Sequence, residues 1–339
     1  MIYLDSAAAY PVLPCALDAL THTSQGNPNS AHAAGEAARD ALEQARSKIA
    51  AIIGAKPEQI HFFPAATAAA QTAIYSLTAA GYGVVRYDTE HHAVLNSTYI
   101  ERKAAQNRGA NGIAYARMLA NNETGEIYAP PEREPGMPWL CDATAAVGHI
   151  PVSVEQLGCT YLIADAMKFG GVPGAAFLYV APGAPFFPMI EGGTPSVALI
   201  AAMAAALEWQ TEHMRENTIR MNSLRFGMIN ELLEISDSTL NTPYESAETI
   251  PHIINMSLPG VDGKTLALLL SKEGVCVSAG AACTTGNNAP SHVLMAMYHD
   301  ETRARSAIRI SLSHENTAAE CEQAAKKIAE CVAHLRAIG

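Results

Sequence analysis

The chain has 339 residues, 49% of them hydrophobic, so it can bury a substantial core and is long enough for two domains. Its formal net charge is −11 and it has no dense Lys/Arg run, which argues against a nucleic-acid or anionic-membrane partner, because both need clustered positive charge. The seven cysteines include no CxxC pair, which disfavours a disulfide framework and a structural zinc site, and no metal is expected.

The start of the chain and its apolar runs predict a cytoplasmic protein without a membrane segment. The N-terminal residues lack the basic start and apolar stretch of a secretory signal. The longest strongly apolar run, Val197–Leu207, is too short to cross a bilayer and predicts a buried helix. Mostly buried, inert thiols in a reducing compartment are expected at Cys15, Cys141, Cys159, Cys276, Cys321 and Cys331.

Short β-like runs alternate with helical runs over the first two thirds of the chain. Ala31–Gly54 predicts an amphipathic helix that ends at a glycine, and Ala129–Pro138 predicts a surface loop. Further helices are expected at Thr67–Ala80, His92–Ala104 and Thr194–Arg220. Strands are expected at Gln59–Phe63, Gly83–Tyr87, Ile113–Met118, Trp139–Asp142, Tyr161–Asp165 and Ala175–Val180. This alternation predicts a largely parallel sheet with helices on both faces.

The pattern changes from Ile235 onward and predicts a smaller α+β domain. Strands are expected at His252–Leu258 and Ala307–Leu312, and helices at Lys264–Lys272 and Ala318–Leu335. The expected organisation is a large α/β domain at residues 16–220 and a small α+β domain formed by residues 1–15 and 221–339.

Asp142 and Lys168 each lie at or just past the end of a predicted strand. Ligands of parallel sheets gather at the carboxyl ends of the strands. A carboxylate there can keep a pyridine nitrogen protonated and a lysine can form a Schiff base, the two functions that a pyridoxal-phosphate site requires. These two residues alone are weak support, since polar residues at strand ends are common.

Seven segments in order resemble the cysteine desulfurases along nearly the whole chain. They are YLDSAAAYPVLP, GNPNSAHAAG (Gly26–Gly35), TEHHAVL (Thr89–Leu95), NNETG (Asn121–Gly125), CDATAAVGHIPV, GAACTTG (Gly280–Gly286) followed by PSHVLMAM, and AIRISL (Ala307–Leu312). The resemblance implies an aspartate-aminotransferase-like fold type I of the class V aminotransferases.

The same resemblance implies the residues that hold pyridoxal 5′-phosphate. Lys168 would form the Schiff base, Asp142 would pair with the ring nitrogen, His91 would stack on the ring and shuttle protons, and Asn122 would bond the phenolic oxygen. The phosphate would meet the helix start at Ala66 and Thr67, and Thr194 would reach the phosphate of a partner subunit, which implies a homodimer. Without that context, His91 is a surface histidine at a helix start and Thr67 a plain N-cap.

Substrate and sulfur chemistry would fall to a second group of residues. Arg309, in a short apolar strand, would bind the carboxylate of L-cysteine, with Asn27 and His32 also at the substrate; a structural salt bridge is the alternative for Arg309. Cys283 stands in a polar, flexible loop where a thiol can ionise, and would accept the sulfur.

The chain departs from the family mainly around the phosphate. A serine and a histidine that precede the lysine in the family are here Asp165 and Met167, and a carboxylate repels a phosphate dianion. The glycine-rich SGGTE loop is here Pro64–Ala68, PAATA, and a glutamine at the phenolic oxygen is Ala145. The loop Glu191–Ser196 is also shortened. These departures indicate a weakened cofactor site.

Further residues are missing between Val94 and Asn121 and between Gly125 and Asp142, away from the central motifs. The expected function is a cysteine desulfurase, which converts L-cysteine to L-alanine and leaves an enzyme persulfide for a protein acceptor such as an iron–sulfur scaffold or a sulfur carrier. Two alternatives stay open: another pyridoxal-phosphate enzyme of this fold, such as a selenocysteine lyase or aminotransferase, and a non-catalytic scaffold or sulfur-relay relative. The sequence does not name the acceptor or decide between cysteine and selenocysteine.

Overall fold

The computed structural model describes the chain except residues 25, 98–110, 190–191, 281–288 and 339. The chain forms two compact units. Unit 1 consists of Met1–Tyr10, Ala120–Tyr128 and Arg215–Gly339, and unit 2 of Pro11–Leu119 and Ala129–Met214. Among the described residues, no helix combines the length and apolar character that crossing a membrane requires.

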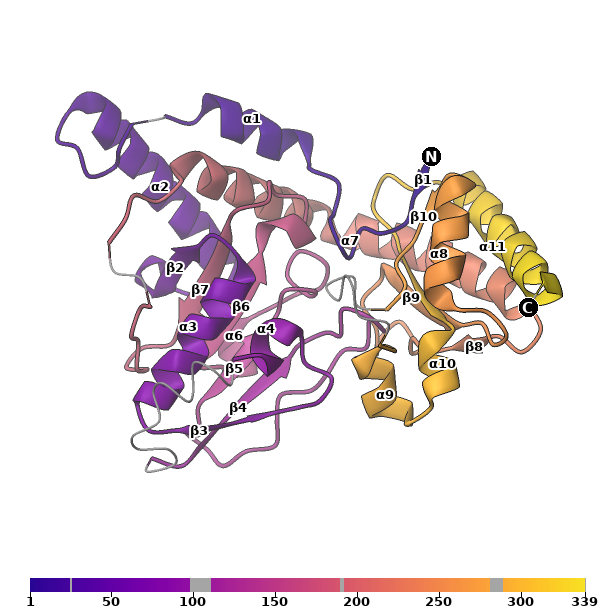
Figure 1. Ribbon diagram of the computed structural model, residues 1–339. Coiled ribbons are helices and arrows are strands. Elements are labelled where there is room, and N and C mark those ends of the chain that lie inside the picture. The colour runs from indigo at the N-terminus through magenta and orange to yellow at the C-terminus, as the bar shows by residue number, and fades with distance from the viewer. Residues whose placement is uncertain (25, 98–110, 190–191, 281–288, 339) are drawn as a thin grey trace. The chain divides into compact units, whose positions relative to one another are not determined.

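Unit 2 is built on a six-stranded sheet in the order β2-β7-β6-β5-β4-β3 (Figure 1). The strands are β2 (Ile60–Phe63), β3 (Gly83–Arg86), β4 (Ile113–Met118), β5 (Trp139–Asp142), β6 (Tyr161–Asp165) and β7 (Ala176–Val180). Strands β3, β4, β5 and β6 are parallel to one another, which confirms the predicted α/β fold. Strand β7 is antiparallel to both β6 and β2, so the sheet is mostly parallel, as expected, with one antiparallel strand.

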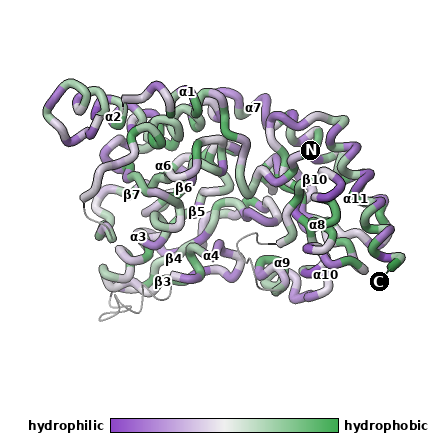
Figure 2. The backbone as a smooth tube through the Cα atoms, turned by 45° about the horizontal axis from the view of Figure 1, so that its top comes forward, coloured by the Kyte–Doolittle hydropathy of each residue, from purple (hydrophilic) through white to green (hydrophobic). Residues whose placement is uncertain are grey.

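Helices of unit 2 cover the sheet, because its central strands are apolar on both faces. Their bounds are α1 (Pro14–His22), α2 (Ala33–Ile53), η1 (Pro57–Gln59), α3 (Ala66–Ala79), α4 (His92–Leu95), α6 (Val154–Leu157), η2 (Ala166–Lys168) and the first part of α7 (Val197–Leu233). Helix α3 packs its alanines and Ile74 against Leu140, Ile163 and Leu178 in one hydrophobic cluster. The strand residues between them, such as Leu162 and Phe177, are also fully buried, and Figure 2 shows β5, β6 and β7 in mainly hydrophobic colours.

Unit 1 combines short strands with helices around its own core. Its strands are β1 (Ile2–Tyr3), β8 (Thr239–Leu240), β9 (Ile253–Ser257), β10 (Val275–Cys276) and β11 (Ala307–Ser311). Its helices are the second part of α7, α8 (Gly263–Lys272), α9 (His292–Tyr298), α10 (Glu301–Arg305) and α11 (Ala318–Ile338). The sheet β11-β9-β8 is antiparallel, and β1 pairs with β10. Apolar residues of β9 and β11 pack with those of α7, α8 and α11.

Most predicted elements are confirmed within a few residues, and two are corrected. Helix α7 begins at Val197 and continues to Leu233, past the predicted end at Arg220. The predicted helix His92–Ala104 is helical only to Leu95, after which two residues form a turn and the remainder lies outside the described residues. Helix α2 ends as predicted, because Gly54 adopts the left-handed conformation at φ 71°.

Candidate active site

The carboxyl ends of five strands in unit 2 meet at one edge of its sheet. Asp142 ends β5 and lies opposite Ile163 of the parallel strand β6, whose chain continues into the turn with Lys168. On the other side, Asp165 and Phe63 both pair with Ala176 of β7, so the ends of β6 and β2 are level. The predicted residues of unit 2 that follow strands therefore gather at this edge, where parallel sheets bind their ligands.

Three side chains hold the turn that carries Lys168. Oδ1 of Asp165 accepts the Met167 N–H at 3.1 Å. The Nε2–H of His149 donates to the Lys168 carbonyl at 2.9 Å, and Nε2 of Gln210 donates to the Phe169 carbonyl at 3.2 Å. His149 and Gln210 are both buried, so these bonds fix the backbone from inside the unit. Lys168 itself is half-buried.

Glycine is required directly after this turn. Gly170 has φ 89°, a conformation that L-residues rarely adopt. A Cβ at this position would lie 2.6 Å from the Leu13 side chain and 3.2 Å from the Pro11 carbonyl. The Gly170 carbonyl accepts the Leu13 N–H at 2.9 Å. The segment after Lys168 is therefore closely packed and has a fixed backbone conformation.

Asp142 is 6% exposed, and its Oδ1 accepts the Thr144 N–H at 3.0 Å. The Thr144 hydroxyl is buried at the same strand end and makes no hydrogen bond to the residues that the structure describes. A buried carboxylate and a spare hydroxyl beside a lysine-bearing turn are a donor and acceptor set that suits a polar heteroaromatic ring. The residues at the ring position therefore fit pyridoxal.

Glu90 is a buried carboxyl near Asp142 to which the sequence alone assigned no role. Its Oε1 accepts the N–H of Met118, the residue paired with Asp142 across β4 and β5, at 2.9 Å. The pKa of Glu90 is raised to about 8, mainly by burial; the Asp142 charge adds to the rise, and the Met118 N–H and Arg117 oppose it. Glu90 is therefore largely protonated at neutral pH and leaves Asp142 as the charged carboxylate of the pair.

His91, the residue expected to stack on the ring, caps helix α4. Its Nδ1 accepts the Ala93 N–H at 3.1 Å, which leaves Nε2 as the nitrogen that carries the proton of the neutral ring. Thr67 is exposed in the first turn of α3, so the alternative of a plain N-cap is corrected: the N-cap is Ala65. Thr194 is exposed in the segment before α7, outside any helix or strand.

The family resemblance predicts that the phosphate binds at the start of α3. In the structure a carboxylate of the protein itself, that of Asp165, is bound there. Oδ2 of Asp165 accepts the N–H of Ala66, the first residue of the helix, at 3.0 Å. The Ala68 N–H is bonded to the Ala65 carbonyl at 3.1 Å. A phosphate needs free amides at such a position, and here a carboxylate takes one of them. The ring position fits the cofactor, whereas the phosphate position does not.

The residues expected at the substrate carboxylate lie in unit 1. Arg309 is 3% exposed in β11, where its Nη2 donates to Oδ1 of Asp5 at 2.8 Å and its Nη1 to the Asn122 carbonyl at 2.9 Å. The structure thus contains the salt bridge that the sequence left as an alternative. The Arg309 Nε is buried and has no acceptor among the described residues. Cys283, the expected sulfur acceptor, lies outside the described residues.

Asn27 and His32 make local backbone contacts in unit 2. Oδ1 of Asn27 accepts the Asn29 N–H at 2.9 Å, and Nδ1 of His32 accepts the Gly35 N–H at 3.2 Å at the start of α2. Both residues are exposed. These bonds account for the GNPNSAHAAG segment as a turn and a helix cap, and a role at the substrate stays a prediction.

Five of the described cysteines are poor nucleophiles, because burial raises the pKa of each thiol. Burial raises the pKa of Cys159 to about 12 and that of Cys321 to about 11, and it raises the pKa of Cys141 well above its usual value. Burial also raises the pKa values of Cys15 and Cys331. The expected inertness of these five thiols agrees with the structure, because a thiol that keeps its proton cannot attack.

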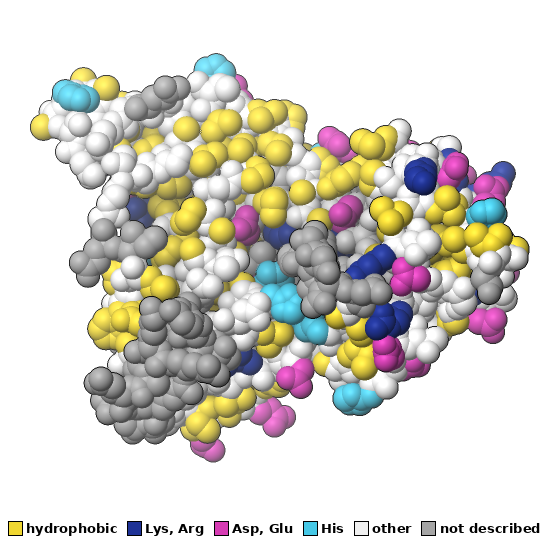
Figure 3. Space-filling view, in the orientation of Figure 1, with side chains coloured by type: hydrophobic (Ala, Val, Ile, Leu, Met, Phe, Trp, Pro, Cys, Tyr) yellow, Lys and Arg dark blue, Asp and Glu magenta, His cyan; other side chains and the backbone are white. Residues whose placement is uncertain are grey.

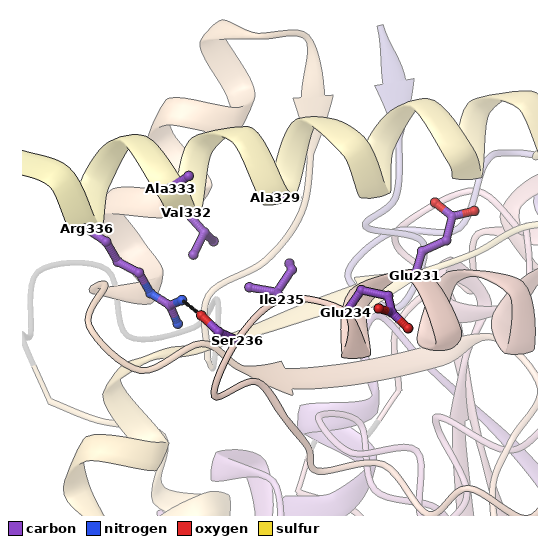
Figure 4. A pocket seen from close by; sticks show the side chains of 8 residues that line it. All are labelled: Glu231, Glu234, Ile235, Ser236, Ala329, Val332, Ala333 and Arg336. Carbon is purple, nitrogen blue, oxygen red and sulfur yellow. Dashed lines mark hydrogen bonds between the residues drawn. The ribbon is translucent and has the colours of Figure 1, made fainter.

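A hollow of about 270 Å³ lies in unit 1 between the end of α7 and α11 (Figure 4). It is lined by Glu231, Glu234, Ile235, Ser236, Ala329, Val332, Ala333 and Arg336. Nη1 of Arg336 donates to the Ser236 hydroxyl at 3.0 Å. The lining contains no lysine, histidine or cysteine, so it offers neither a Schiff-base amine nor a sulfur acceptor.

Sequence reasoning missed three residues of this edge: Glu90, His149 and Gln210. Glu90 lies within the matched segment TEHHAVL and His149 within CDATAAVGHIPV, and only for His149 was a polar residue in an otherwise apolar stretch the available signal. Gln210 lies in an apolar helix 41 residues from its partner Phe169, and a contact of that range leaves no local pattern.

The fold and the lysine-bearing sheet edge define an α/β enzyme of the class V aminotransferase type. The family model "Aminotransferase class-V" matches residues 2–125 and 183–323. The IscS-like cysteine desulfurase of Mycobacterium tuberculosis is 31% identical, with 99% of this chain and 97% of the relative covered. The cysteine desulfurase IscS of Dictyoglomus turgidum is 33% identical, with 99% and 96% covered.

A solved NifS-like protein superposes with a TM-score of 0.86 at 28% identity, covering 98% of this chain and 99% of that structure. The chain therefore belongs to the cysteine desulfurase family of class V aminotransferases. The alignment with the Mycobacterium tuberculosis relative spans 383 positions, more than the 339 residues of this chain, so that relative carries segments that this chain lacks.

Proposed function

We propose that the chain is a cysteine desulfurase that uses pyridoxal 5′-phosphate at Lys168 and passes sulfur to Cys283. The observation that carries the proposal is the placement of Lys168 and Asp142 after adjacent parallel strands of a family member. When bound, the cofactor supplies an electron sink for the charge that develops at the substrate α-carbon. No role is proposed for the hollow of unit 1.

Each residue of the sheet edge contributes a defined task. The Lys168 amine would hold the cofactor aldehyde and, once the substrate amine has displaced it, would be free to move the α-proton, and the turn held by His149 would keep it in place. Asp142 would accept the ring N–H of the cofactor, supported by Glu90, whose raised pKa of about 8 keeps a second charge away from Asp142. The proton-bearing Nε2 of His91 is the group proposed to exchange protons with the substrate.

Sulfur transfer is proposed to follow from thiolate attack by Cys283 on the sulfur of L-cysteine. The new S–S bond forms as the substrate C–S bond breaks, and the electron pair stays on carbon, where protonation gives alanine. Arg309 is proposed to bind the substrate carboxylate, which would compete with Asp5 for the guanidinium. The persulfide then goes to a protein acceptor, an iron–sulfur scaffold or a sulfur carrier, and the cysteine usage supports a cytoplasmic location.

A homodimer is also proposed. Exposed apolar side chains support it: Val12 and Leu17 of the α1 region are 36% and 49% exposed, and Phe187 and Met189 are 46% and 47% exposed. Figure 3 shows hydrophobic side chains over the part of unit 2 where α1 lies. Thr194, exposed before α7, is the residue proposed to reach the partner subunit.

Turnover of L-cysteine tests the function. Purified protein incubated with pyridoxal 5′-phosphate, L-cysteine and a thiol reductant is expected to release equal amounts of alanine and sulfide. Lys168→Ala is expected to abolish both products and the visible absorbance of the lysine-bound aldehyde. Absorbance that persists in this variant would contradict the assignment of Lys168.

The Asp165 bond to Ala66 favours a second candidate, a non-catalytic relative that does not retain the cofactor. A protein with this role would show no visible absorbance with added pyridoxal 5′-phosphate and no alanine from L-cysteine. A desulfurase shows both, so the same experiment separates the two candidates.

A further inference from the structure

The Asp165 carboxylate bridges two backbone amides from different elements. Its Oδ2 accepts the Ala66 N–H at the start of α3 at 3.0 Å, and its Oδ1 accepts the Met167 N–H in the turn before Lys168 at 3.1 Å. Ala66 and Asp165 are 99 residues apart in the chain. Each oxygen of the Asp165 carboxylate therefore accepts one backbone N–H.

These amides form an anion site by their position in the fold. Helix α3 runs from Ala66 to Ala79, and its N-cap Ala65 supplies no side-chain bond, so the positive end of the helix dipole has no local cap. The ends of β2 and β6 are level on the two sides of Ala176, which puts Asp165 beside the helix start. Asp165 therefore caps α3 from a distant strand.

We propose that Asp165 permanently fills the phosphate position of the cofactor site, so that the chain discriminates little between phosphorylated and unphosphorylated forms of the pyridoxal vitamers. This inference rests on the proposed cofactor site at Lys168. A phosphate reaches the Ala66 N–H at the start of α3 only by displacing the carboxylate, and it meets a like charge as it does so. The hydroxymethyl group of an unphosphorylated vitamer carries no charge and can donate a hydrogen bond to the same carboxylate.

Non-covalent binding of pyridoxamine and pyridoxamine 5′-phosphate tests the proposal, because neither amine reacts with Lys168. Dissociation constants are measured for the parent and for Asp165→Asn by the fluorescence of the vitamers. The parent is expected to bind the two forms within about tenfold of each other, and Asp165→Asn to tighten binding of the phosphate form at least about tenfold, with pyridoxamine little changed. Asparagine keeps one acceptor oxygen for the two amides while it removes the charge.

Asp262→Asn is the matched control. Asp262 also caps a helix, since its Oδ1 accepts the Thr265 N–H at 2.9 Å at the start of α8 in unit 1. The substitution removes the same charge from a cap outside the sheet edge. The ratio of the two dissociation constants is expected to stay at the parent value.

The proposal is overturned if the parent binds pyridoxamine 5′-phosphate more than about 100-fold tighter than pyridoxamine, or if Asp165→Asn changes both affinities alike. The ratio of the parent's dissociation constants for the two vitamers tests the proposal even if Asp165→Asn does not fold. If the parent binds neither vitamer, the proposed cofactor site fails, and inorganic phosphate then tests Asp165 separately: it should raise the melting temperature of Asp165→Asn but not of the parent, and equal shifts overturn the inference.

Discussion

The bond between His149 and the Lys168 carbonyl leads to a prediction about stability at acid pH. His149 is 2% exposed, and its Nε2–H donates to the Lys168 carbonyl at 2.9 Å. Burial lowers the pKa of His149 to about 4 from its ordinary 6.5, although the carbonyl opposes the change. The folded chain therefore keeps the imidazole neutral where the unfolded chain protonates it.

The direction of the pH dependence follows from proton binding to His149 in the folded and unfolded states. Above pH 6.5 the imidazole is neutral in both states and its full contribution to stability is present. Between pH 6.5 and about 4 the unfolded state binds the extra proton, so stability falls as the pH falls. A gap from 6.5 to about 4 corresponds to roughly 3 kcal/mol of unfolding free energy.

Urea unfolding at pH steps from 7 to 4 measures this effect. His149→Gln keeps an amide donor for the Lys168 carbonyl and does not titrate, so its unfolding free energy should fall by roughly 3 kcal/mol less than that of the parent over this range. His22→Gln, at an exposed histidine of α1 paired with Asp18, should behave like the parent. The same pH dependence in the parent and in His149→Gln would refute the role given to the buried imidazole.

Three further predictions concern assembly and two buried titratable side chains, Arg309 and Glu90. Light scattering at micromolar concentration should give twice the mass of one chain, and a monomer would count against a shared site. Arg309→Gln should lower the unfolding free energy by about 2 to 4 kcal/mol, because Asp5 and the Asn122 carbonyl lose a buried donor, and no loss in urea would contradict the bridge. The pKa of Glu90 is raised from 4.5 to about 8, so the folded state keeps the extra proton and the stability of the parent should fall as the pH rises from 4.5 to 8. The unfolding free energy of Glu90→Gln should fall less than that of the parent between pH 5 and pH 9. An equal fall in the two proteins would contradict the raised pKa of Glu90.

The strands of unit 2 could be predicted closely from sequence, and their directions only in part. Trp139–Asp142 and Tyr161–Asp165 are apolar runs that end in a carboxylate, which marks their ends. The antiparallel direction of Ala176–Val180 follows from the short connection after Asp165, which contains only a 3-10 turn, whereas a parallel crossover needs a helix or a longer segment. This connection length was available in the sequence.

Helix α7 shows why a helix end can be misjudged. Asn222 and Gly227 weaken helical propensity after Arg220, yet the helix continues to Leu233. Met221, Met228, Ile229 and Leu232 are buried in the core of unit 1, and that burial outweighs the local preference. Tertiary packing of this kind is not visible in a local pattern.

The candidate site was predictable where motifs are continuous in sequence and not where contacts span long distances. Asp142, Lys168 and His91 lie at the expected sheet edge because each follows a strand. Asp165 was expected to disfavour a phosphate by its charge, but its bond to the Ala66 N–H joins two segments 99 residues apart. Strands β2 and β6 end opposite the same residue of β7, Ala176, and this sheet register brings the Asp165 carboxylate to the start of α3.

The fate of the substrate sulfur tests the central claim most directly. The parent, loaded with pyridoxal 5′-phosphate and treated with L-cysteine without reductant, should gain one sulfur atom on the peptide that contains Cys283, as measured by mass spectrometry. Cys283→Ser should gain none and should lose alanine formation by orders of magnitude, because a hydroxyl does not ionise near neutral pH and cannot accept the sulfur. Added sulfur on another cysteine, or full alanine production by Cys283→Ser, would contradict a desulfurase and favour a lyase or aminotransferase.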